Sequence, residues 1–77
     1  MTTEQLQKFI HATPFRPFTL HLADQRTLTI PHPDFIAHAP GARSAAVVDP
    51  RDGSAEVVDL LLVVSLKAAV SSADHPS

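Results

Sequence analysis

A chain of 77 residues with a net charge of −2 and no cysteine has room for one small domain. The lack of cysteine excludes disulfides and thiolate metal sites. Only six lysines and arginines are present, and no two lie closer than eight positions, so the sequence predicts no basic surface of the kind that binds nucleic acid.

Residues 2–12 predict a short helix. Thr2, followed three residues later by Gln5, has the form of a capping box. The apolar side chains that come next share one face at helical spacing: Leu6, Phe9 and Ile10. Pro14 disfavours helical geometry at the residue before it, so we expect the helix to end near Ala12.

A segment bounded by two prolines, residues 14–18, follows as an extended connector. We expect its phenylalanines, Phe15 and Phe18, to pack between the helix and a sheet, because aromatic side chains contribute much of a small core. A recognition surface is the alternative. Base stacking by these rings and Phe35 is disfavoured, since stacking platforms interleave aromatic with exposed basic residues.

Residues 18–30 alternate apolar and polar side chains, which predicts a β-hairpin with one apolar face. We expect a three-residue loop at 24–26, which places Leu22 opposite Leu28 and keeps the large apolar groups on one face. A two-residue loop would instead set apolar side chains opposite polar ones.

The segment after this hairpin predicts a corner. Pro31 and Pro33 end the strand, because proline cannot donate a hydrogen bond to a neighbouring strand. Residues 35 and 36 are then expected to form a short buried segment, as one helical turn with Asp34 near its start.

A second hairpin is predicted from residues 45–48 and 56–58. The turn between them, residues 49–53, carries Pro50 at a position that favours proline and Gly53 at a left-handed exit.

The last apolar stretch, residues 57–66, contains only two polar residues, Asp59 and Ser65. Such a run is typical of a strand buried on both faces, which a domain of this size cannot cover alone. We therefore expect a break at residues 59 and 60 that gives two short strands, together with a second subunit that covers one face. The residues expected at this interaction surface are Val57, Leu61 and Val63.

These elements predict an α+β fold, with the N-terminal helix packed on a small bent antiparallel sheet of four or five strands. A partly open SH3-like or Sm-like barrel is one form of this layout. We expect the domain to span residues 1–67 and residues 68–77 to be a disordered tail, because they show no pattern. Sm-like proteins form rings and bind RNA, but without a basic patch the analogy favours oligomerisation more than RNA binding.

Five histidines invite a metal hypothesis, with His21, His32 and His38 as candidates. Zinc needs three or four converging ligands, and the diagnostic spacings are absent. His32 and Asp34 could form an acid–base pair with Ser44 as nucleophile, but a turn explains the presence of these residues equally well. We therefore expect no enzyme activity, no catalytic residue, no cofactor and no metal.

The chain resembles a group of short bacterial proteins of unknown function. It reads PFRPF at residues 14–18, HLADQR at 21–26, PHPDF at 31–35 and DLLLV at 59–63. The group typically reads PFRPFxxHLADGR, then PHPEF or PHPDF, then DLLLV, and the likeness covers residues 4–67. Gln25 stands where glycine is usual, which indicates a left-handed position. The resemblance implies a bacterial cytoplasmic protein and no particular activity.

We expect a non-enzymatic module that self-associates or binds a protein partner through residues 57–66. An Sm-like nucleic-acid-binding module is the alternative, and a small metal-binding or catalytic protein is the third possibility. No membrane span is expected, since the longest apolar run, residues 60–64, is far below the roughly 20 residues required. The N-terminus does not have the pattern of a signal peptide, so a cytoplasmic location is expected, and no small-molecule substrate is predicted.

Overall fold

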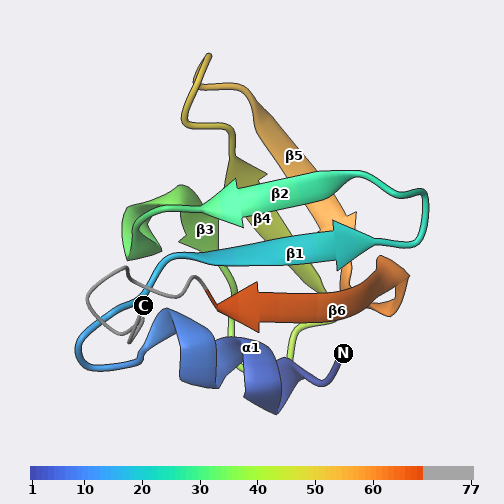
Figure 1. Ribbon diagram of the computed structural model, residues 1–77. Helices are drawn as coiled ribbons and strands as arrows, with labels where there is room; N and C mark the ends of the chain where they lie inside the picture. Colours follow the sequence, from blue (N-terminus) through green and yellow to red (C-terminus); the bar gives the residue numbers. More distant parts are fainter. Residues whose placement is uncertain (69–77) are drawn as a thin grey trace, which may run out of the picture.

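The computed structural model describes residues 1–68, in which helix α1 (Thr3–Ile10) lies next to two small antiparallel sheets (Figure 1). The predicted capping box is present. The Thr2 hydroxyl accepts a hydrogen bond from the Gln5 N–H at 3.1 Å, and the Gln5 side chain accepts one from the Thr2 N–H at 3.2 Å. The helix ends two residues before the predicted end at Ala12.

Each sheet has three strands in the part of the chain that the structure describes. The first sheet has the order β2-β1-β6 and the second has the order β3-β4-β5. The strands are β1 (Phe18–Leu22), β2 (Thr27–Ile30), β3 (Ile36–Ala37), β4 (Ser44–Val48), β5 (Ala55–Asp59) and β6 (Val63–Ala68). The α+β class is confirmed. The strand number was predicted too low, because the segment after the first hairpin contributes the two-residue strand β3.

The chain passes from the second sheet to the first through a 3₁₀ turn, η2 (Leu60–Leu62), which joins β5 to β6. The turn begins at Asp59, whose carboxylate accepts a hydrogen bond from the Leu61 N–H at 2.9 Å. The predicted break at residues 59 and 60 is therefore confirmed, and a side-chain cap starts the new direction.

A second 3₁₀ turn, η1 (Pro33–Phe35), forms the corner between β2 and β3. Its cap is His32, whose Nδ1 accepts a hydrogen bond from the Asp34 N–H at 3.2 Å. A helical turn is present with Asp34 near its start, but it covers Pro33–Phe35 and is capped by His32, whereas Ile36, predicted in the turn, is buried in β3.

The first hairpin has the predicted apolar face but not the predicted register. Leu20 lies opposite Leu28, a shift of two residues from the prediction, and such a shift keeps every side chain on its own face. The loop closes one residue earlier than expected, because the Leu22 N–H donates to the Arg26 carbonyl at 2.9 Å. The loop therefore keeps the predicted length of three residues but covers 23–25, and Gln25 at its last position has the left-handed φ of 72° that such loops favour.

The core lies between the two sheets, and α1 packs on it through Leu6. Phe18 is fully buried, and its ring meets Phe9 edge-to-face with centroids 5.5 Å apart and Phe15 at 5.9 Å. Phe15 is partly buried against the same cluster, so the connector phenylalanines pack between helix and sheet as predicted.

The second hairpin, formed by β4 and β5, agrees with the prediction, and Gly53 in its turn has a left-handed φ of 76°. Strand β6 ends at Ala68, which pairs with Phe18, so the strand extends one residue beyond the predicted domain end. The remainder of the predicted tail, residues 69–77, lies outside the described residues. Within residues 1–68, no helix is long and apolar enough to cross a membrane.

Candidate interaction surface

Four large apolar side chains are exposed where the chain passes from β5 through η2 to β6. Their exposed fractions are 73% for Val57, 73% for Leu61, 54% for Leu62 and 66% for Val64. We call these four residues the corner patch. Clustered apolar exposure on a small protein commonly marks an interaction site, whereas single exposed apolar residues need no explanation.

The structure corrects the predicted surface at one position. Val57 and Leu61 are exposed as expected, but Val63 is only 2% exposed and belongs to the core. The sequence reasoning missed Leu62 and Val64. Strand alternation does not continue through η2, so residues after the turn no longer share the face that a continuous strand would give them.

Local hydrogen bonds hold the corner in place. The Leu60 side chain points into the core, and its N–H donates to the Arg43 carbonyl at 2.7 Å. On the outside, Arg43 Nη2 lies 3.9 Å from Asp59 Oδ2, and this carboxylate also caps the turn. Leu61 and Leu62 are therefore held outward by a capped turn that is anchored on both sides.

Residues of this corner contribute to the lining of two surface hollows. The first, of about 330 Å³, lies between the β1–β2 turn and β5, and Val57 and Leu62 contribute to its lining. The second, of about 470 Å³, lies between α1 and β6, and Val64 contributes to it beside Met1 and Phe9. Three of the four corner-patch residues therefore line a hollow, Val57 and Leu62 the first and Val64 the second.

Charged side chains form the rim of the first hollow. Arg26 donates from Nη1 and Nη2 to the Glu56 carboxylate at 3.1 and 2.7 Å, and from Nε to Asp24 at 2.8 Å. The Arg26 guanidinium lowers the pKa of Glu56. The pKa of Asp24 is lowered mainly by the hydrogen bond from the Arg26 backbone N–H and then by the guanidinium. The two carboxylates in turn raise the pKa of Arg26. Because these groups are about half exposed, the network orients the rim more than it stabilises the fold.

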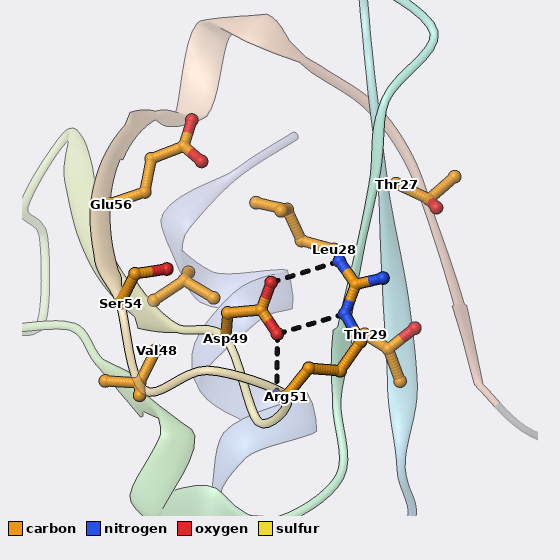
Figure 2. Close-up of a pocket in the computed structure, with 9 residues that line it drawn as sticks. Thr27, Leu28, Thr29, Val48, Asp49, Arg51, Ser54 and Glu56 are labelled. Atoms are coloured by element: carbon orange, nitrogen blue, oxygen red, sulfur yellow. Dashed lines mark hydrogen bonds and ion pairs between the residues drawn. The ribbon is translucent and has the colours of Figure 1, made fainter.

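A third hollow, of about 310 Å³, lies between β2 and the β4–β5 hairpin (Figure 2). Arg51 crosses its mouth and donates from Nη2 to Asp49 Oδ2 at 3.1 Å and from its backbone N–H to Asp49 Oδ1 at 2.8 Å. The guanidinium lowers the pKa of Asp49. The Ser54 hydroxyl donates to Asp52 at 2.7 Å, a contact within the turn. These contacts lie within the turn and stabilise the hairpin.

The candidate histidines lie on separate segments: His21 on β1, His32 before η1 and His38 after β3. Within the described residues, no three potential metal ligands come together. The Nδ1 of His38 lies 2.8 Å from Gln7 Nε2 and its Nε2 lies 2.8 Å from the Ala42 carbonyl oxygen, so this ring ties α1 to the loop before β4. The catalytic candidate Ser44 starts β4 opposite Asp59, on the other hairpin from the His32 turn.

No protein-family model matches this chain, and no curated protein or solved structure matches it either. The resemblance to a group of short bacterial proteins therefore stays a prediction.

Proposed function

We propose that this protein is a non-enzymatic, cytoplasmic module that self-associates through the corner patch. The observation that carries the proposal is the exposure of Val57, Leu61, Leu62 and Val64 on a corner that is fixed by hydrogen bonds. Exposed apolar side chains on a rigid support lose little conformational entropy on binding, which favours association.

The apolar burial that the corner patch offers is of the same order as the cost of association. Fully burying a valine or leucine contributes about 1.5–3 kcal/mol, so burying most of this patch in two copies contributes roughly 8–16 kcal/mol. The loss of translational and rotational freedom opposes this by about 4–15 kcal/mol. Because the two ranges overlap, we expect association to depend on concentration, which a concentration series can resolve.

A different protein partner is the alternative occupant of the same patch. The Sm-like nucleic-acid function has weaker support, because the net charge is −2 and carboxylates engage Arg26 and Arg51.

The test is the solution mass of the whole chain, measured by size-exclusion chromatography with light scattering over a hundredfold concentration range. We expect an integral multiple of the chain mass that dissociates on dilution, and we expect Leu61→Glu to shift it to the monomer. Thr29→Glu is the matched control, since Thr29 is also exposed but lies on β2 away from the patch. A wild-type chain that is monomeric at every concentration, or a Leu61→Glu variant that stays associated, contradicts the proposal.

A further inference from the structure

Strand β5 ends the second sheet, so one of its sides has no neighbouring strand within residues 1–68. The pairing with β4 determines which backbone groups face that side. The Asp49 N–H donates to the Ser54 carbonyl at 2.7 Å, and the Leu60 N–H donates to the Arg43 carbonyl at 2.7 Å. Both hydrogen bonds join residues that are opposite each other in the continued β4–β5 register. In an antiparallel ladder, pairs that exchange hydrogen bonds alternate with pairs that do not, so every second residue of β5 turns its backbone N–H and carbonyl away from β4. The backbone groups that face outward therefore belong to Ala55, Val57 and Asp59.

The other outer strands carry features that discourage pairing. Strand β6 has a register shift near its start and an exposed lysine, Lys67. Strand β3 has only two residues, and the β4–β5 hairpin lies across the hollow beside the outer side of β2. Strand β5 has five residues with no proline, lysine or register shift, and Val57 at its centre is exposed. Across a hollow β5 faces the β1–β2 turn, which reaches it through the Arg26–Glu56 ion pair, so this edge is protected by side chains alone and not by a bulge, a proline or short length.

We propose that β5 pairs antiparallel with β5 of a second copy across a two-fold axis centred on Val57, so that the second sheet continues through the dimer. This inference rests on the proposed self-association and specifies its partner and geometry. An axis at this position sets Val57 beside its own copy, Ala55 opposite Asp59, and Glu56 opposite Val58, with hydrogen bonds between the outward groups.

The charges of the strand are compatible with this register. No two carboxylates lie opposite each other, which removes the repulsion that opposes pairing of like-charged strands. Each carboxylate also has a local donor, since Glu56 is held by Arg26 and Asp59 by the Leu61 N–H. The side chains that meet directly at the axis are the two valines, which are apolar and β-branched as strand pairing favours.

A cysteine cross-link tests the axis directly, because the chain has no native cysteine. Cα atoms of a hydrogen-bonded antiparallel pair lie about 5.5 Å apart, within the range of about 4.4–6.8 Å that disulfides span. Oxidised Val57→Cys is therefore expected to form a covalent dimer at concentrations where the wild type associates. Thr29→Cys, exposed on the outer side of β2, is the control and is expected to remain uncross-linked under the same conditions. Failure of the Val57→Cys variant to cross-link overturns the proposed axis.

A proline variant tests the edge without altering the corner patch. Ala55→Pro removes an outward N–H at the first residue of β5, a position that tolerates proline. The dimer is expected to weaken at least tenfold, because two hydrogen bonds related by the axis are lost. Thr27→Pro is the matched control, since Thr27 starts β2 and its N–H also points outward. If Ala55→Pro does not fold by circular dichroism, the cross-link alone decides.

The two proposals fail in different ways. If Leu61→Glu dissociates the complex but Ala55→Pro and the cross-link show nothing, self-association stands and the β5 pairing is wrong. A wild-type trimer or larger ring also overturns the two-fold axis. A wild-type monomer overturns both proposals.

Discussion

Leu60 and Leu61 are adjacent in one 3₁₀ turn but have opposite environments, with 3% and 73% of their surfaces exposed. Leu60→Ala is expected to lower the free energy of unfolding by about 2–5 kcal/mol, because it removes buried methyl groups and leaves a cavity. Leu61→Ala is expected to change it by less than about 0.5 kcal/mol in the monomer, because most of that side chain already contacts water. A chain of 77 residues has roughly 4–12 kcal/mol of stability in total, so the first variant loses a large share.

Urea unfolding followed by far-ultraviolet circular dichroism measures both variants. The protein must be dilute enough to be monomeric, since association adds a concentration-dependent stability. We expect a lower midpoint for Leu60→Ala at an unchanged denaturant dependence, and a wild-type midpoint for Leu61→Ala. At high protein concentration, the urea midpoint of Leu61→Ala should fall below that of the wild type, because the proposed interface loses contacts. Equal losses in dilute solution would refute the assignment of these two side chains to core and surface.

Two further predictions concern the first hairpin and its charges. Gln25→Gly is expected to raise the stability by roughly 0.5–1 kcal/mol, because a left-handed φ costs a non-glycine residue about 1–2 kcal/mol and the greater freedom of unfolded glycine offsets only part of this. A thermal melting temperature that is unchanged or lower would contradict it. Arg26 lowers the pKa of Glu56 in the folded state. The stabilisation that this ion pair gives the fold is therefore fully present above the unfolded-state pKa of glutamate, about 4.3, and is lost as the pH falls through the lower folded-state pKa. Glu56→Gln should therefore flatten the decline of stability between about pH 4.5 and 2, and superimposable pH profiles for variant and wild type would argue against the ion pair.

Local signals in the sequence were sufficient for several features of the fold. The capping box of α1, the apolar face of the first hairpin and the turn of the second all depend on residues within a few positions of one another. The break after β5 was also predictable, because Asp59 is a helix-capping residue type within an apolar run. The α+β class followed from these elements, and so did the location of the exposed apolar surface near Val57 and Leu61.

The register of the first hairpin needed the tertiary structure. Two registers that differ by two residues place the same side chains on the same face, so the apolar pattern cannot distinguish them. The choice depends on the left-handed backbone of Gln25, which the alternation of apolar and polar residues does not reveal.

The members of the interaction surface were likewise decided by tertiary contacts. The run from Leu60 to Val64 is uniformly apolar, so its sequence contains no period that separates core from surface. The turn is oriented by the hydrogen bond from the Leu60 N–H to the Arg43 carbonyl, which joins residues far apart in the chain. That contact turns Leu60 into the core and leaves Leu61 outside, and Val63 is then buried at the start of β6. The sequence by itself therefore determined that this segment is apolar and breaks at Asp59, whereas packing against distant residues determined which of its side chains face a partner.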